Sequence, residues 1–296
     1  MAGRAVEKMS FEDIFDDKVQ YEMPFFQRGY SWEKENWVQL LDDIQENILD
    51  EFGGEKKFSE TEFFFGSIVI AESKQQTLPN MPRRFLVIDG QQRLTTVYIA
   101  LSIIYNLLRK KADESPELAL TGEIGSIARH IINDVKTKDD YDRIKLLSCK
   151  GDKMPTYQTV FDTDIKPRSP TLNDDYYSYN ENSNKLKNLA AYLRIFFGKK
   201  EVEVLLDWKN ILLKSLKVVW IPIDENKDDI QSIFETLNDR GRPLTASELI
   251  CNYIFKPFAS EDSQKFNALH TEKWLTTIGK IDKSGNIEDY LITLFS

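Results

Sequence analysis

The amino-acid sequence predicts an α/β (α+β) fold in which a buried strand leads directly into a long helix. Residues 62–71 form a continuous β-prone run, and residues 84–88 have the apolar character of a second buried strand. This second strand continues into Asp89-Gly90 and then into apolar residues at helical spacing over about 91–110. The hydrophobic fraction of 41% and the charged fraction of 29% are those of an ordinary globular protein.

The elements before this sheet follow from the same kinds of pattern. Residues 10–20 predict a short amphipathic helix, and Pro24 and Gly29 keep the next stretch extended or turning. Ser31 can cap a helix over 33–50, in which apolar residues recur at helical spacing.

Beyond residue 112 the sequence predicts mainly helices. We therefore divide the chain into an α/β region, 1–112, and a mainly helical region, 113–296. A strand near 217–223 could return to the first sheet. The last apolar segment, 287–295, has no helix-terminating signal, so we expect that the chain is a fragment of a longer protein.

Charge and cysteine usage exclude several classes of protein. The formal net charge of −9 disfavours broad coating of nucleic acid. Local basic clefts at Arg83–Arg84 or Arg109–Lys111 stay open, although short basic runs are usually solvated surface. Cys149 and Cys251 have no CxxC pattern, which argues against a disulfide framework or a zinc site. The N-terminus lacks the long apolar stretch of a signal peptide, and Val97–Leu108 is too short to cross a bilayer, so we expect a cytoplasmic protein without a membrane segment.

The segment Asp89–Thr96 places polar side chains at the predicted start of the long helix. Backbone N–H groups there have no intrahelical partner and carry partial positive charge, so they favour an anion. Gly90 lets the backbone approach a ligand closely, and Arg93 has a planar donor fork that suits phosphate oxygens. Asp89 could hold a divalent cation against the phosphates. Neutral donors complete the segment: Gln91, Gln92, Thr95 and Thr96.

An ordinary capped helix is the alternative for this segment, with Asp89 as the cap and Arg93 paired with a carboxylate. A second segment offers a similar choice. Gln27 and Arg28 are part of an aromatic hinge, or they face the same anion while the flanking rings of Tyr30 and Trp32 stack on a base.

Catalysis by histidine has little support in the sequence. His130 and His270 are the only histidines, and both lie in helical patterns. There is no HExxH, GxSxG or Walker sequence. A nuclease of the His-Asn-His type needs more histidines than this chain has, so no nuclease active site is visible.

Three segments together resemble the N-terminal domain family of GmrSD-type restriction endonucleases (GmrS-like). Pro24–Trp32 match the family pattern P-x-F/Y-Q-R-x-Y-x-W, and Ile88–Thr96 match I-D-G-Q-Q-R-L-T-T. Phe234–Thr245 match F-x-x-L-N-x-R-G-x-x-L-T, a segment that taken alone is only a capped turn between helices. The segment Phe64–Ile68 also fits, and the resemblance covers nearly the whole chain.

The resemblance implies a ParB/sulfiredoxin-like fold, with a small mixed sheet, the DGQQR turn at a helix N-terminus, and helical additions. It implies that this turn binds and hydrolyses a nucleoside triphosphate with Mg²⁺ as cofactor. In full-length relatives a C-terminal His-Asn-His nuclease domain cuts DNA, often DNA with modified bases or phosphorothioate linkages. The expected partners are therefore modified DNA and a C-terminal nuclease domain or subunit, with a homo-oligomer as a further option.

By position, the resemblance assigns a nucleotide site to ten residues: Gln27, Arg28, Asp89, Gly90, Gln91, Gln92, Arg93, Asn238, Asp239 and Arg240. We expect Thr95 and Thr96 to add donors, and Tyr30 and Trp32 to contact DNA bases. In the catalytic set, Arg93 neutralises phosphate charge with help from Arg28, Asp89 holds Mg²⁺ or orients water, and Gln91 or Gln92 positions that water.

The sequence thus predicts an NTP-binding and NTP-hydrolysing regulatory or sensor module of a modification-dependent, anti-phage DNA restriction system. Two alternatives stay open. One is a ParB-like, metal-dependent DNA phosphodiesterase. The other is a non-catalytic module that recognises DNA or a protein through Tyr30 and Trp32.

Overall fold

The computed structural model of the chain describes residues 6–16, 18–24, 27–49, 61–73, 79–162 and 184–224, and the single positions 228, 232, 233 and 236. The chain divides into two compact units, Met1–Pro24 with Gly29–Ile230, and Phe25–Arg28 with Gln231–Ser296. Every strand and helix named below belongs to the first unit.

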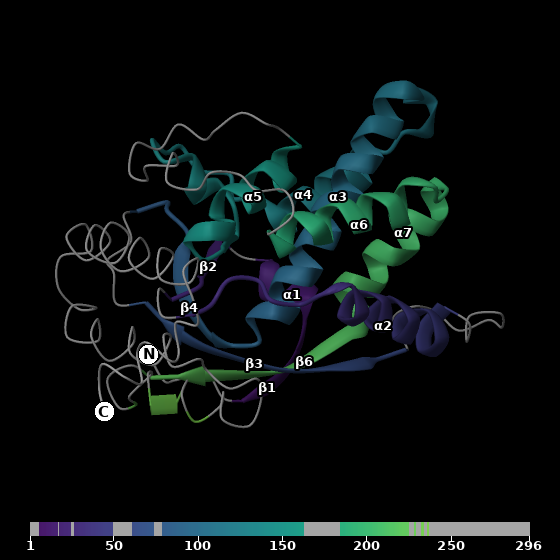
Figure 1. Cartoon of the computed structure of the whole chain (residues 1–296). Helices are drawn as coiled ribbons and strands as arrows, with labels where there is room; N and C mark the ends of the chain where they lie inside the picture. Colours follow the sequence, from purple (N-terminus) through teal and green to yellow (C-terminus); the bar gives the residue numbers. More distant parts are fainter. Residues whose placement is uncertain are drawn as a thin grey trace, which may run out of the picture. The chain divides into compact units, whose positions relative to one another are not determined.

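The β-prone segments form one mixed sheet, which has six strands within the described residues, in the order β1-β6-β3-β4-β2-β5. The strands are β1 (Glu7–Ser10), β2 (Val19–Glu22), β3 (Phe63–Glu72), β4 (Arg83–Asp89), β5 (Leu146–Leu147) and β6 (Leu216–Ile223). β6 pairs in parallel with β3, and β2 pairs in parallel with β4 and β5, whereas the β1–β6 and β3–β4 pairs are antiparallel. β6 lies between β1 and β3 (Figure 1), which confirms the predicted return of a strand near 217–223.

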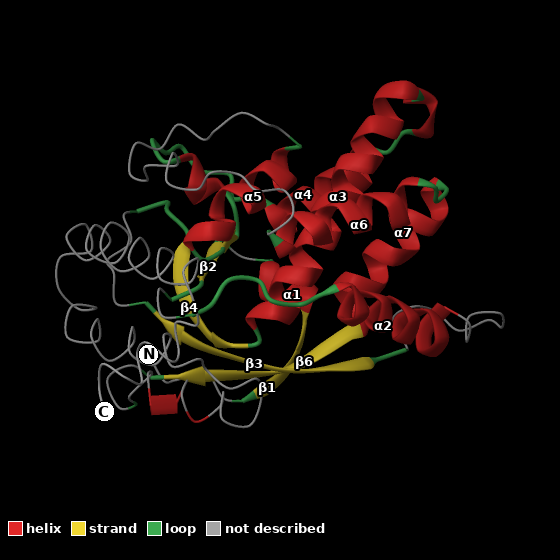
Figure 2. Cartoon of the chain, viewed as in Figure 1, coloured by secondary structure: helices red, strands yellow, loops and turns green. Residues whose placement is uncertain are grey.

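Seven α-helices occur in the same part of the chain: α1 (Phe11–Phe15), α2 (Lys34–Ile44), α3 (Gln91–Glu114), α4 (Thr121–Ile131), α5 (Lys150–Phe161), α6 (Lys185–Gly198) and α7 (Val202–Asn210). α2 and α7 each continue into a π-helical turn, Gln45–Leu49 and Ile211–Ser215. In Figure 2 the labelled helices lie above β1, β3 and β6, while β2 and β4 rise to the level of α1 at the left of the view. The mixed α/β (α+β) fold predicted from the sequence is therefore confirmed.

α3 is the central element of this unit. Most of its side chains from Leu94 to Leu108 are buried, and α4, α5, α6 and α7 all pack against it. A helix with apolar side chains on all sides is stable only when other elements surround it. The predicted boundary at residue 112 falls inside α3, and the chain on both sides of it belongs to one compact unit.

The segment predicted as one helix over 10–20 is instead a short helix followed by a strand. Ser10 caps α1, since its hydroxyl accepts from the Asp13 N–H at 3.2 Å and its own N–H donates to the Asp13 carboxylate at 3.0 Å. At the other end, Lys145 Nζ donates to the carbonyl oxygens of Phe15 and Asp16 at 2.5 and 3.2 Å. Lys145 lies far away in the sequence, so the local pattern cannot place the end of α1.

The sequence pattern also does not predict α5, because Gly151 and Pro155 favour a loop. Pro155 has no N–H, so the Gly151 carbonyl lacks its usual helical donor. Asn184 Nδ2, just before α6, approaches this carbonyl at 3.4 Å. A side chain from another element thus helps the helix to accommodate its proline.

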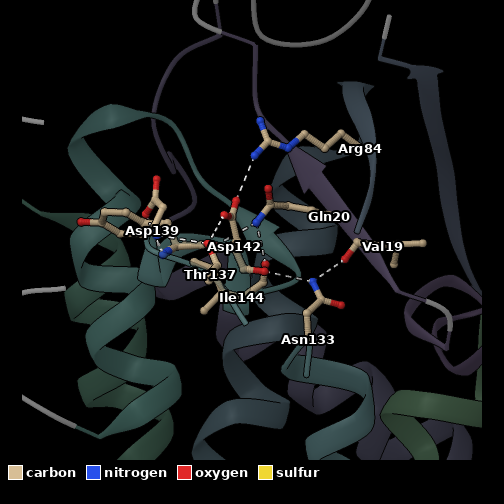
Figure 3. A network of polar contacts seen from close by, with 9 residues as sticks. Val19, Gln20, Arg84, Asn133, Thr137, Asp139, Asp142 and Ile144 are labelled. Atoms are coloured by element: carbon tan, nitrogen blue, oxygen red, sulfur yellow. Dashed lines mark hydrogen bonds and ion pairs between the residues drawn. The ribbon is translucent and has the colours of Figure 1, made fainter. Parts of the chain in front are cut away.

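Polar side chains form a network around the start of β4 (Figure 3). Arg84 Nη2 donates to Asp142 Oδ1 at 2.9 Å, and Thr137 Oγ1 donates to Asp142 Oδ2 at 2.6 Å. The buried side-chain amides of Gln20 and Asn133 bind main-chain oxygens in the same region. Arg84 is therefore held by the fold, which argues against a basic cleft at this position.

Candidate functional site

Gly90 shapes the turn between β4 and α3, where the central sequence motif lies. Its φ of +88° is in the left-handed region that side chains disfavour. A Cβ at this position would lie 2.8 Å from the Ser67 carbonyl oxygen and 2.9 Å from Ile68 Cγ1. α3 begins at once, with the Leu94 N–H bonded to the Gly90 oxygen at 3.0 Å. The turn packs against β3 so closely that any other residue would force a shift.

No side chain among the described residues caps the first turn of α3. Its N–H groups at Gln91, Gln92 and Arg93 precede the first intrahelical hydrogen bond, and the helix dipole adds partial positive charge at this end. Because Gly90 has no side chain, the residue before the helix offers no oxygen to these groups. The arrangement suits an anionic ligand.

The guanidinium of Arg93 lies against Gly66 of β3. Gly66 has a φ of +94° and lies where the register between β3 and β6 shifts. A Cβ on Gly66 would lie 2.9 Å from Arg93 Nε and 3.0 Å from Arg93 Cζ. The sequence prediction does not include Gly66 in the site, although a glycine inside a strand pattern signals a bulge or a close approach.

Two polar residues of the motif, Asp89 and Gln91, are half-buried. Neither makes a side-chain hydrogen bond or ion pair with any residue that the structure describes, and Arg93 likewise has no ion pair there. These three side chains are thus available to a ligand.

Gln92 has a different role from Gln91. Its Oε1 accepts from the Ser31 N–H at 2.8 Å, and its Nε2 approaches the Gly29 carbonyl oxygen at 3.5 Å. The side chain therefore joins α3 to the first sequence motif. The sequence alone cannot show that Gln91 and Gln92 have different roles, because the contacts of Gln92 are with a segment far away in the chain.

Thr95, Thr96 and Tyr30 are buried. The hydroxyls of Tyr30 and Thr96 share a hydrogen bond of 2.7 Å, and Trp37 Nε1 donates to the Tyr30 hydroxyl at 2.9 Å. Burial raises the pKa of the Tyr30 phenol well above its ordinary value. These contacts are internal to the fold, and the predicted roles of these residues as ligand contacts stay predictions.

Trp32 is half-buried, and its ring meets Phe65 edge-on with 6.4 Å between ring centroids. Its contact with DNA stays a prediction. The predicted roles of the remaining site residues also stay predictions. Gln27 and Arg28 belong to the second compact unit, and the segment Asn238-Asp239-Arg240 lies outside the described residues.

Other chemistry has little support in the described part of the chain. No group of three or more His, Cys, Asp or Glu residues there is arranged to hold a metal ion. His130 is buried in α4 and contacts the Ser126 carbonyl, whereas His270 and Cys251 lie outside the described residues. No helix among the described residues is long and apolar enough to span a bilayer.

Residues 11–255 match the family described as the GmrSD restriction endonuclease, N-terminal domain. Because this match covers well over half of the sequence, the chain belongs to that family. No curated protein matches the chain. The restriction context and the family resemblance that the sequence predicts are therefore confirmed.

Proposed function

We propose that the β4–α3 turn binds the phosphates of a nucleoside triphosphate, and that this domain hydrolyses the nucleotide to regulate DNA restriction. One observation carries the proposal: the uncapped first turn of α3 lies beside an arginine that has no ion pair in the described residues. The family resemblance supports a nucleoside triphosphate over a simple phosphate. Membership in a restriction endonuclease family supports DNA, and a nuclease domain or subunit, as the partners.

The charges at the turn suit a polyphosphate. Backbone N–H groups at a helix start bind phosphate oxygens directly, and Arg93 adds a permanent positive charge with several donors. Contact with Gly66 restricts where this guanidinium can lie. A charge held in place before binding stabilises phosphate with little reorganisation.

Asp89 fits the role expected for Mg²⁺ binding. It supplies one carboxylate at the turn, and no larger metal-binding cluster occurs among the described residues. Mg²⁺ usually binds through one or two carboxylates together with substrate phosphates and water. A bound Mg²⁺ would neutralise phosphate charge. Gln91, which has no internal partner in the described structure, would orient the attacking water.

Arg93→Ala tests this proposal. We expect the affinity for a nucleoside triphosphate with Mg²⁺ to fall about 10- to 100-fold, because hydrogen bonds to charged groups are lost. Titration calorimetry with ATP, GTP, CTP and UTP in turn gives the affinity, and phosphate release gives turnover. Arg109→Ala, an exposed position on the same helix, is the matched control and is expected to change neither.

Unchanged affinity and turnover in folded Arg93→Ala would contradict the proposal. Binding without turnover in the unaltered chain would instead favour a recognition module. Nicking of a plasmid by the purified chain with Mg²⁺, lost in Asp89→Ala, would favour a DNA phosphodiesterase.

A further inference from the structure

Side chains from two helices bind the segment Gly29–Ser31. From α3, Gln92 accepts from the Ser31 N–H at 2.8 Å, and Thr96 shares a 2.7 Å hydrogen bond with the Tyr30 hydroxyl. From α5, Asp152 Oδ2 accepts from the Tyr30 N–H at 2.6 Å. We call these contacts the 29–31 clamp.

Asp152 is the charged member of the 29–31 clamp, and it is 6% exposed. Its Oδ1 accepts from Asn184 Nδ2 at 3.0 Å, and the Cys149 thiol lies 3.5 Å from its Oδ2. Asp152 has no ion pair with a Lys, Arg or His among the residues that the structure describes. A buried carboxylate without a cation is unfavourable unless several donors satisfy it. Here every donor is neutral, and one of them is the main chain of the clamped segment.

Gly29 shows how closely the segment lies to this carboxylate. A Cβ on Gly29 would lie 3.0 Å from Asp152 Oδ2 and 3.4 Å from Cys149 Sγ. A larger residue at position 29 would therefore require either the segment or the Asp152 side chain to shift. Because Gly29 has no side chain, its main chain can pack directly against the Asp152 carboxylate.

We propose that Asp152 is a positioning residue for the β4–α3 turn, acting through Gly29–Ser31 and Gln92. Asp152 fixes the main chain of this segment, and the segment in turn occupies the side chain of Gln92. If the segment moves, Gln92 loses its donor and the first turn of α3 loses a support next to Arg93. The effect on ligand binding rests on the proposed function, whereas the effect on the turn itself does not.

Asn184 allows the proposal to be tested by exchanging two residues. In Asp152→Asn an amide group replaces the carboxylate that accepts from the Asn184 amide. In Asn184→Asp two carboxylates face each other at the present 3.0 Å contact. The double variant Asp152→Asn/Asn184→Asp restores a donor and an acceptor and keeps the net charge. The Asn184 oxygen also accepts from the Lys187 N–H at 3.0 Å at the start of α6, a role that Asp fills equally well.

Hydrogen exchange in the ligand-free protein is the first measurement. We expect each single variant to exchange about tenfold faster at the Tyr30 and Ser31 amides and in the first turn of α3, and the double variant to return near the original rates. The second measurement is the affinity for inorganic triphosphate with Mg²⁺. We expect it to fall about tenfold in the single variants and to recover in the double variant.

Ile131→Val serves as the control for a general loss of stability, because Ile131 is fully buried in α4. We expect it to leave both the Ser31 exchange and the triphosphate affinity unchanged. Asn184→Ser is a milder variant, since Ser can still cap α6 but cannot reach Asp152 as the amide does. We expect it to fold and to show a smaller change of the same sign. It can therefore replace a single variant that fails to fold.

The outcomes separate this inference from the proposed function. If the unaltered chain binds neither a nucleoside triphosphate nor inorganic triphosphate, the proposed function fails, and the exchange data alone decide whether the 29–31 clamp supports the turn. Unchanged exchange in the folded variants overturns the inference. Faster exchange with unchanged triphosphate affinity also overturns the positioning role while the proposed function stands. A folded double variant that stays as fast as the single variants overturns the pairing of Asp152 with Asn184.

Discussion

The two ends of β4 use the same side-chain chemistry in different ways. Near its start, Arg84 pairs with Asp142 at 2.9 Å, and the two side chains are only 28% and 9% exposed. At its other end, Asp89 and the following Arg93 are half-buried, yet neither has an ion-pair partner in the described part of the chain. The comparison shows that the partners of a charged residue, rather than its type, distinguish a structural ion pair from a candidate binding site.

Asp142→Ala is expected to have the largest effect on stability, a loss of about 2 to 3 kcal/mol in the free energy of unfolding. The substitution removes the Asp142 carboxylate, which accepts from both Arg84 and the Thr137 hydroxyl. Asp89→Ala at the other end is expected to change this free energy by less than about 0.5 kcal/mol. Urea unfolding of both variants measures the difference, and equal losses would show that the Arg84–Asp142 pair contributes no more to stability than Asp89 does.

Gly66→Ala is expected to affect both stability and the site. The left-handed conformation of Gly66 disfavours a side chain by about 1 to 2 kcal/mol, and the new Cβ would displace Arg93. We expect lower stability together with weaker triphosphate binding. Gly125→Ala in α4 is the control, because a Cβ there meets nothing within 4 Å and a helical Ala is favoured over Gly by about 0.5 to 1 kcal/mol. Full triphosphate affinity in folded Gly66→Ala would show that Arg93 does not act from its present position.

His130 gives the smallest predicted effect, and it concerns the part of the chain that leads into the network of Figure 3. Burial lowers the pKa of His130 below its ordinary 6.5, against the opposing influence of the Ser126 carbonyl, Glu12 and Asp16. In the window below 6.5 the unfolded chain therefore binds a proton that the folded protein does not. The contribution of neutral His130 to the free energy of unfolding is complete above pH 6.5 and is lost as the pH falls toward the pKa of His130 in the folded protein.

Urea unfolding at a series of pH values between about 5 and 8 checks this effect. We expect stability to fall with falling pH in the unaltered chain, and His130→Gln to flatten this part of the profile. An identical slope in His130→Gln would assign the pH dependence to other groups.

Much of the sheet and of its central helix could be predicted from the sequence. Continuous β-prone runs identify β3, β4 and β6, and helical spacing identifies α3, because in each case the local pattern and the packing agree. α1 and α5 differ, because their ends and interior depend on Lys145 and Asn184, which come from distant parts of the chain. Contacts of that kind leave no local signal.

The residues of the candidate site also differ in whether the sequence predicts their roles. Gly90 and Arg93 follow from the strand-turn-helix pattern and the chemistry of phosphate binding. The use of Gln92 for an internal contact, the burial of Tyr30 and the part played by Asp152 depend on distances between segments far apart in the sequence. A sequence pattern gives the types of residue at a site but not the partner that each one takes.

The position of β6 has a consequence for how the domain folds during its synthesis. β1 (Glu7–Ser10) is made well before β6 (Leu216–Ile223), yet β6 is its only neighbour among the described strands and also covers the edge of β3. Pairings between strands so far apart in the chain form slowly, and until then the edge of β3 can pair with other chains. All six described strands can therefore pair only after residues 216–223 have emerged from the ribosome. A chain that ends before Leu216 is expected to aggregate.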